Sequence, residues 1–287
     1  MRRLFPLLML LAAVAAPAGL AAGCGSDDLP SISAADAAQA TRDAHTARTT
    51  MRVEMTGMGL PRPITVTGEG VTATDAPQMN MTFELGDLLP GGETHLVLDG
   101  ARLYAQLPQG GGFELPGGAS WVRLDLARMV AALGIEPRGL REVFRMTPQQ
   151  QLESIQAAGS MKEVGEEEID GVRTTHLRGT LTLRDYARTL PAERRAELRR
   201  AIRQIAELTG EEPEALDEPT PTELWVDEDA HVRRMVQSSK VPAQEGMPPG
   251  SIKIAVEFDD FGAALDVDPP AGDDVYDATR MLVRELR

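Results

Sequence analysis

Met51-Arg52-Val53-Glu54-Met55-Thr56 alternates apolar and polar residues, and this alternation recurs along much of the 287-residue chain. Successive side chains of a β-strand point to opposite faces, so Met51, Val53 and Met55 share one face. A slip of one residue would move that whole apolar set into water, which makes the strand register well specified. The stretch therefore predicts a strand with one buried face and one solvated face.

Similar runs follow, separated by turns rich in glycine and proline. They span residues 64–71, 79–85, 95–98, 103–107, 121–126, 162–169, 172–183, 223–227, 231–241 and 252–258. Two of the turns, Asp99-Gly100 and Asp170-Gly171, carry the Asp-Gly pair that favours tight hairpins. The pattern predicts an antiparallel sheet of about ten strands.

Helical patterns interrupt the strands in a few places only. An alanine-rich helix is predicted over 33–48, short apolar segments over 126–133 and 140–146, a capped helix over 147–159 and an amphipathic helix over 186–208. The stripe of the last helix includes Leu198, Ile202 and Ile205. Because strands and helices do not alternate, the fold class is α+β, and no boundary divides residues 33–287 into two domains.

The N-terminal residues end in Cys24, which is the only cysteine of the chain. Arg2 and Arg3 precede an apolar segment, and the small residues 21–23 stand directly before the cysteine. This order resembles a bacterial lipoprotein signal, in which the thiol is acylated and the chain is cut before it. The resemblance implies that residues 1–23 are removed and that Cys24 is the lipid-attachment residue.

A short tether over residues 24–32 would then join the acyl chains to the fold. Two or three acyl chains make membrane association essentially permanent, so the expected location is the outer face of the cell membrane. The alternative, an uncleaved anchor helix, is disfavoured because Pro17 and Gly19 interrupt an apolar stretch shorter than the ~20 residues of a membrane span.

The charge of the chain argues against nucleic acid as a partner. Removal of residues 1–23 takes away Arg2 and Arg3 and leaves 27 basic against 44 acidic residues, a net charge of −17. Phosphate backbones and anionic headgroups repel such a surface. The mature chain has no cysteine besides Cys24, so disulfides and thiolate metal sites are excluded.

No motif for catalysis, a metal or a cofactor stands out. The four histidines, at positions 45, 95, 176 and 231, are isolated in the sequence, and each is interpreted as a surface or strand-face residue. Gly118-Ala119-Ser120-Trp121-Val122 departs from a nucleophile elbow at its last position. Asp227-Glu228-Asp229 lacks the spacing of a calcium loop. We therefore expect a protein that is not an enzyme.

Apolar residues of the early strands are candidates for a ligand-binding face. Four methionines lie on the faces predicted to be buried, together with Val53, Phe83 and Leu85; the methionines are Met51, Met55, Met79 and Met81. Methionine adapts to varied apolar ligands, but it also fills ordinary cores. The alternation shows which face is buried and leaves open whether a lipid or a helix buries it.

Three phrases of the sequence resemble a known family. They are Ser120-Trp121-Val122-Arg123-Leu124-Asp125-Leu126, then Ile169-Asp170-Gly171-Val172-Arg173-Thr174-Thr175-His176-Leu177-Arg178-Gly179, and then Glu223-Leu224-Trp225-Val226-Asp227 followed by Val232-Arg233-Arg234-Met235. In this order, behind a lipoprotein signal, they are similar to the actinobacterial LppX/LprG-type lipoproteins, a LolA-like group. The family usually has glycine in the turn after the third phrase, where this chain has Ala230.

The resemblance implies a curved antiparallel sheet, an incomplete barrel, that wraps helices on its concave face. It also implies an apolar cavity for acylated lipids or glycolipids, which the protein carries or displays in the cell envelope. The expected lining is Met51, Val53, Met55, Met79, Met81, Phe83, Leu85, Leu198, Ile202 and Ile205. A second hypothesis keeps the fold but fills the core, leaving a noncatalytic sensor or interaction lipoprotein that meets another envelope protein.

Overall fold

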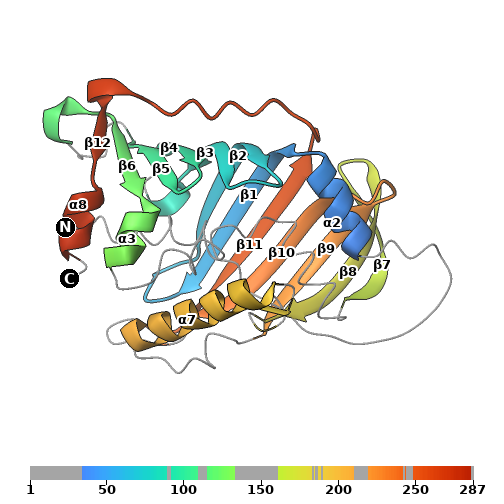
Figure 1. Ribbon diagram of the computed structural model, residues 1–287. Helices are drawn as coiled ribbons and strands as arrows, with labels where there is room; N and C mark the ends of the chain where they lie inside the picture. The colour runs from blue at the N-terminus through green and yellow to red at the C-terminus, as the bar shows by residue number, and fades with distance from the viewer. Residues whose placement is uncertain are drawn as a thin grey trace.

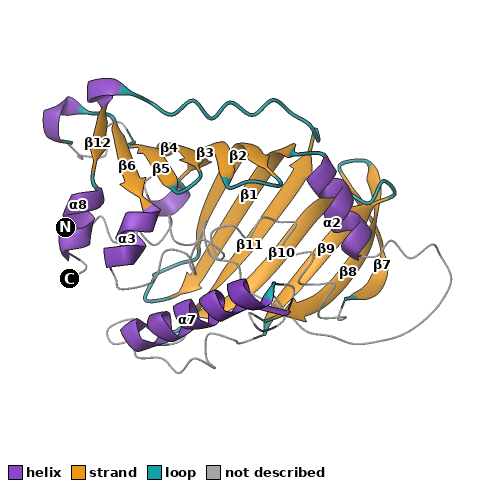
Figure 2. Cartoon of the chain, viewed as in Figure 1, coloured by secondary structure: helices purple, strands orange, loops and turns teal. Residues whose placement is uncertain are grey.

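The computed structural model describes residues 34–88, 92–108, 115–132, 161–182, 184, 187–188, 190–209, 219–241, 243 and 248–285. Its main feature is one curved sheet, drawn in Figures 1 and 2, in the order β12-β6-β5-β4-β3-β2-β1-β11-β10-β9-β8-β7. The strands are β1 (Thr46–Gly57), β2 (Ile64–Ala73), β3 (Gln78–Glu84), β4 (Glu93–Asp99), β5 (Arg102–Gln106), β6 (Trp121–Asp125), β7 (Lys162–Ile169), β8 (Val172–Leu181), β9 (Thr220–Asp227), β10 (Val232–Val241), β11 (Gly250–Asp259) and β12 (Val275–Asp277).

The sheet consists of two antiparallel meanders joined side by side. Strands β1 to β6 form the first and β7 to β11 the second, and the antiparallel pair of β1 with β11 joins them. Strand β12 is the exception, because it pairs with β6 in parallel. The sheet has β7 and β12 at its two ends, which agrees with the expected open and mostly antiparallel architecture and gives twelve strands where about ten were predicted.

The predicted alternation and both predicted hairpins are confirmed. On β1, Val53 is 1% exposed and lies opposite Ile254 of β11 and Val66 of β2. Asp170 and Gly171, between β7 and β8, both have positive φ angles, of 49° and 81°. Two such residues in succession match the right-handed twist of the strands that they connect.

Four α-helices accompany the sheet in the described part of the chain: α2 (Ala34–Asp43), α3 (Leu126–Ala132), α7 (Ala192–Thr209) and α8 (Thr279–Glu285). Figure 2 shows how small their share is beside the strands. The predicted segment 126–133 is confirmed as α3, whereas 140–146 and 147–159 lie outside the described residues. Helix α8 and strand β12 were not predicted.

The first predicted helix is shorter than expected, because it ends at Asp43 and β1 begins at Thr46. The chain pairs with β2 from Thr46 and with β11 from Arg48, and the β-branched threonines of this stretch suit a strand. Helix α2 packs on β10: Ala37 is fully buried, and the Thr41 hydroxyl accepts a hydrogen bond from the Val232 N–H at 3.1 Å.

Candidate functional site

The predicted strand residues of the candidate site come together in one apolar cluster. Val53, Met81 and Phe83 are each 1% exposed, Leu85 is 2% exposed and Met79 is 6% exposed. The cluster extends to β4, β5 and β6 and to Ala278, just before α8; its other buried members are Ile64, Val66, Leu96, Leu103, Ala105 and Leu124. The early strands therefore bury one continuous apolar face.

Register explains why these side chains meet. Met81 of β3 lies opposite Leu96 of β4. Phe83 lies opposite Gly68 of β2, and its ring occupies the space that a side chain would need there, since a Cβ atom on Gly68 would come within 2.5 Å of the ring. A bulky aromatic residue and a glycine thus share one cross-strand position.

A second cluster lies mainly on the other meander, under helix α2, and includes Ala47 of β1. Its buried residues are Ala37, Ala47, Leu177, Leu224, Val226, Val232, Met235, Val256 and Phe258. Met51 of β1 and Ile254 of β11 are partly buried and pack against both clusters. The apolar face therefore continues across the joint between the two meanders.

At the joint itself, part of that face is only half-buried. Met51, Met55, Ile252 and Ile254, which we call the central strip, are half-buried, in contrast to the closed residues on β3. Met55 lies directly opposite Ile252 on the neighbouring strand. The strip is a half-buried apolar surface between two packed regions.

The predicted helical part of the site lies in a third, separate cluster. Leu198 of α7 is fully buried with Ala187 and Leu190, and Ile202 packs against them in part. The side chain of Ile205 lies outside the described residues. Figure 1 shows α7 running across the strands rather than along them. That its stripe faces the apolar side of the sheet stays a prediction.

The anchor residue Cys24 also lies outside the described residues. Among the helices that the structure describes, none is both long and apolar enough to cross a membrane. In the same part of the chain no group of three or more His, Cys, Asp or Glu side chains could hold a metal ion.

The opposite face of β7 to β9 carries a polar network that the sequence analysis missed. His176 is buried, and its two ring nitrogens lie 2.9 Å from Glu167 Oε1 and 2.8 Å from Glu223 Oε2. One buried imidazole thus bridges two carboxylates that come from different strands. Arg178 donates a further hydrogen bond, of 3.0 Å, to Glu223.

Trp225 completes this network. Its ring stacks on His176 with the centroids 4.2 Å apart, and its Nε1–H donates to Glu167 Oε2 at 2.9 Å. The hydrogen bond from Trp225 is the main reason why the pKa of Glu167 is lowered. Burial raises the pKa of Glu223, but hydrogen bonds from Arg178 and His176 outweigh it, and the pKa is lowered. The side chains satisfy one another, so the network stabilises strand packing.

The hairpin itself was the signal that could have found this network. With the turn fixed at Asp170-Gly171, Glu167 pairs with Thr174, two residues before His176. His176 in turn lies opposite Trp225. Isolation along the sequence therefore says little about isolation in space.

Comparison with known proteins gives distant matches. No protein-family model matches the chain. An uncharacterised 31.2 kDa protein of Streptomyces griseus, named for the rplA-rplJ intergenic region, is 27% identical over 172 residues, and this match spans about half of that protein (50%) and 58% of the chain.

The mycobacterial lipoproteins LprF and LppX are among the matching structures. LprF of Mycobacterium bovis is 16% identical, with a TM-score of 0.38, covering 83% of this chain and 95% of its own. LppX of Mycobacterium tuberculosis is 13% identical, with a TM-score of 0.40, covering 84% of this chain and 100% of its own. A LolA superfamily protein of Nitrosomonas europaea is 9% identical, with a TM-score of 0.23, covering 78% of this chain and 92% of its own.

These matches agree with the resemblance to LppX/LprG-type lipoproteins that the sequence phrases suggested. At such identities and TM-scores they add nothing to the account of the fold, which follows from the strand order and the register of this chain.

Proposed function

We propose that this protein is a lipoprotein, anchored through Cys24 to the outer face of the cell membrane, that binds acylated lipids or glycolipids and carries or displays them in the cell envelope. The observation that carries the proposal is the central strip. Met51, Met55, Ile252 and Ile254 form a half-buried apolar surface between two closed clusters. In a single-domain fold over residues 33–287, α7 would cover part of this surface with Leu198, Ile202 and Ile205.

The chemistry of the strip suits an acyl chain. Burying apolar surface is worth about 25 cal/mol per Å², without any requirement for a particular orientation. The unbranched side chains of Met51 and Met55 adjust to chains of different shape. We expect the ligand to be recognised mainly by its hydrocarbon part at this place, and Met79, Met81, Phe83 and Leu85 to form the wall behind it.

A second candidate function rests on a different observation. Val53, Met81, Phe83 and Leu85 are only 1–2% exposed because protein atoms cover them, as in a filled core. A protein with such a core would act as a noncatalytic sensor or interaction lipoprotein and would meet an envelope protein through its surface. The two candidates differ in whether lipid accompanies the protein.

Two substitutions separate these candidates. We expect Met55→Trp to leave the protein folded and to reduce bound lipid, because a half-covered surface accepts added volume. We expect Met81→Trp to destabilise the protein by about 1–3 kcal/mol, because its site is closed. Native mass spectrometry of detergent-extracted protein measures the lipid, and thermal melts of the same samples measure stability.

Wild-type protein without lipid, together with a destabilised Met55→Trp variant, would contradict the carrier function and support the filled core. The anchor is tested separately by metabolic labelling with a fatty acid. Cys24→Ala is expected to abolish the label, and undiminished labelling would refute the assignment of Cys24.

A further inference from the structure

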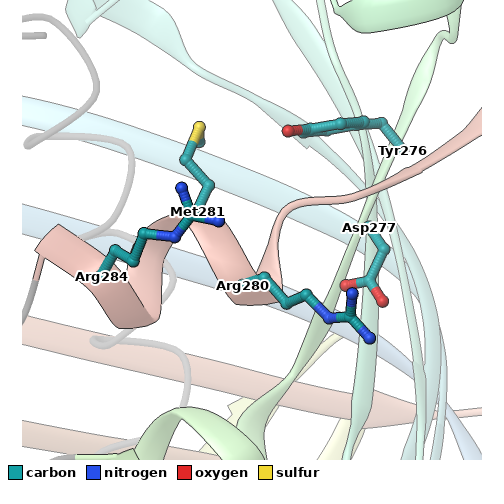
Figure 3. A pocket seen from close by; sticks show the side chains of 5 residues that line it. All are labelled: Tyr276, Asp277, Arg280, Met281 and Arg284. Carbon is teal, nitrogen blue, oxygen red and sulfur yellow. The ribbon is translucent and has the colours of Figure 1, made fainter.

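A pocket of about 440 Å³ lies at the β12 end of the sheet, away from the central strip. Five residues of β12 and α8 line it: Tyr276, Asp277, Arg280, Met281 and Arg284. In Figure 3, Tyr276 reaches toward Met281, Arg280 extends toward Asp277, and Arg284 turns back along the helix. Basic and apolar side chains are thus combined in one small concavity.

Helix α8 presents these side chains because its other side is tied to the sheet. Ala278, just before the helix, is 4% exposed within the cluster of the early strands, and Leu282 packs against the same cluster. Met281 is 40% exposed, and it is one of two large apolar side chains that are exposed in the described part of the chain. An apolar side chain kept in water beside a pocket is available for contact with a ligand.

The acidic residue of the pocket is already neutralised from outside it. Arg123 of β6 donates to Asp277 Oδ2 at 2.6 Å, and the Thr279 N–H donates to Asp277 Oδ1 at 3.1 Å. Burial raises the pKa of Asp277, but the hydrogen bonds from Thr279 and Arg123 outweigh it and lower the pKa to about 2. Asp277 therefore remains ionised and paired, and it does not need Arg280.

Arg280 and Arg284 have no such partner. Within the described residues neither guanidinium is hydrogen-bonded or ion-paired, although the chain has 44 acidic and only 29 basic residues. Residues four apart on a helix lie on the same side of it, and both arginines line the same pocket. Guanidinium groups bind phosphate and carboxylate oxygens with two parallel hydrogen bonds, which favours an anion as the missing partner.

We propose that this pocket binds an anionic amphiphile of the phosphate-ester class. Arg280 and Arg284 hold the phosphate, while Tyr276 and Met281 contact the first carbons of the apolar part. The shared chemistry is a phosphate joined to a hydrocarbon, whether it comes from a membrane lipid headgroup or from a free alkyl phosphate. The site is independent of the proposed lipid carriage, because it lies at the far end of the sheet from β1 and β11.

Phosphorus NMR tests the proposal on the full chain in dodecyl maltoside, a detergent without phosphorus. The probe is hexyl phosphate, and the comparison ligands are inorganic phosphate and hexanol. Binding of hexanol, which has no phosphorus, is measured by calorimetry. We expect hexyl phosphate to bind most tightly. In the double variant Arg280→Gln/Arg284→Gln its affinity should fall at least about tenfold, because the hydrogen bonds from both charged groups to the phosphate are lost.

The matched control is Arg199→Gln/Arg203→Gln, which removes two exposed arginines with the same spacing from α7. Its affinity for hexyl phosphate should equal that of the wild type. Met281→Gln should lower the affinity for hexyl phosphate but not the affinity for inorganic phosphate. A thermal melt of each variant shows whether it is folded.

Three results would overturn the proposal. The first is an equal loss of affinity for hexyl phosphate in Arg280→Gln/Arg284→Gln and in Arg199→Gln/Arg203→Gln. The others are equal affinities for hexanol and hexyl phosphate, or equal affinities for inorganic phosphate and hexyl phosphate. None of these results bears on lipid at the central strip, which the Met55→Trp variant reports.

To separate a membrane lipid from a free alkyl phosphate as the source of the ligand, phosphatidic acid is added to nanodiscs of phosphatidylcholine that hold the protein. A protein-bound phosphatidic acid adduct that Arg280→Gln/Arg284→Gln loses identifies a membrane lipid, and its absence while hexyl phosphate still binds identifies a free alkyl phosphate.

Discussion

The two ends of the sheet use charge in opposite ways. At the β7 end, His176, Glu167, Glu223 and Arg178 satisfy one another, and Trp225 packs on the histidine ring. At the β12 end, the ion pair of Arg123 with Asp277 fixes the short parallel strand, while Arg280 and Arg284 of α8 have no hydrogen-bond or ion-pair partner among the described residues. Charged groups that fix a strand are paired within the protein, and those left unpaired are free to meet a ligand.

The difference follows from how each end is built. Strand β7 is exposed along nearly its whole length, so few apolar contacts hold it, and side chains from β8 and β9 supply the attachment instead. Strand β12 has only three residues, but Ala278 and Leu282 beside it reach the apolar cluster. The β12 end therefore depends less on charge for its stability, and we expect substitutions at the two ends to differ in effect.

The largest effect is expected at His176. His176→Asn would remove at least one of the two hydrogen bonds between the imidazole and the carboxylates, and the stack on Trp225, at a cost of roughly 2–3 kcal/mol in the free energy of unfolding. The control is His45→Asn, since His45 is 74% exposed and pairs with Asp75 at the surface. An exposed pair is worth about 0–1 kcal/mol. Urea denaturation of both variants measures the difference.

If His176→Asn and His45→Asn lower the free energy of unfolding by the same amount, the network does not stabilise the β7 end. The two ends of the sheet would then not differ in their dependence on charge. The double variant His176→Asn/Glu167→Gln gives a second check. The effects of substitutions within one network are not additive. Glu167→Gln should therefore lower the free energy of unfolding by clearly less in the His176→Asn variant than in the wild type.

A smaller effect with a definite pH dependence is expected at Asp277. Its pKa falls from 3.8 to about 2 on folding, so its contribution is fully present above pH 3.8 and is lost as the pH falls through about 2. We expect Asp277→Asn to cost roughly 1–2 kcal/mol at pH 7, less than the full shift implies because the side chain is 34% exposed to solvent.

Denaturation curves at pH 7, 4 and 2 measure this dependence. The gap between wild type and Asp277→Asn should be constant from pH 7 to pH 4 and should narrow toward pH 2. A gap that stays constant down to pH 2 would show that the hydrogen bonds to Asp277 do not lower its pKa.

Much of the sheet could be predicted from the sequence, because period-two alternation and Asp-Gly turns are local signals. Val53 and Phe83 were placed on the buried face from their neighbours alone, and the Asp170-Gly171 turn was placed correctly. Strand β12 was missed for a physical reason. Its three residues, Val275–Asp277, are too few to show a period, and it exists because β6 offers it a parallel edge.

The candidate site was predictable only in part. Alternation brings Met51 and Met55 to the apolar face, but it does not show that they are half-buried while Met81 is closed, since that depends on what covers each strand. His176 depends on partners from other strands, and the pocket of α8, although its lining residues are close together in the chain, is positioned by the distant strand β6. Arg123 and Asp277, for example, are 154 positions apart and meet only through the pairing of β6 with β12.

The smallest effect concerns the turn between β9 and β10, next to the network at the β7 end. Ala230 has a φ of 64°, a left-handed conformation that glycine adopts without steric cost and alanine does not. Ala230→Gly should therefore raise the free energy of unfolding by about 0.5–1 kcal/mol.

The reciprocal control is Gly171→Ala in the turn between β7 and β8, where φ is 81° and no atom lies within 4 Å of an added Cβ. Because only backbone strain acts there, the free energy of unfolding of Gly171→Ala should be lower than that of the wild type by about 1 kcal/mol. Thermal and urea melts of both variants measure these opposite shifts, and a destabilised Ala230→Gly would show that the alanine side chain contributes more to the strongly held end of the sheet than its backbone conformation costs.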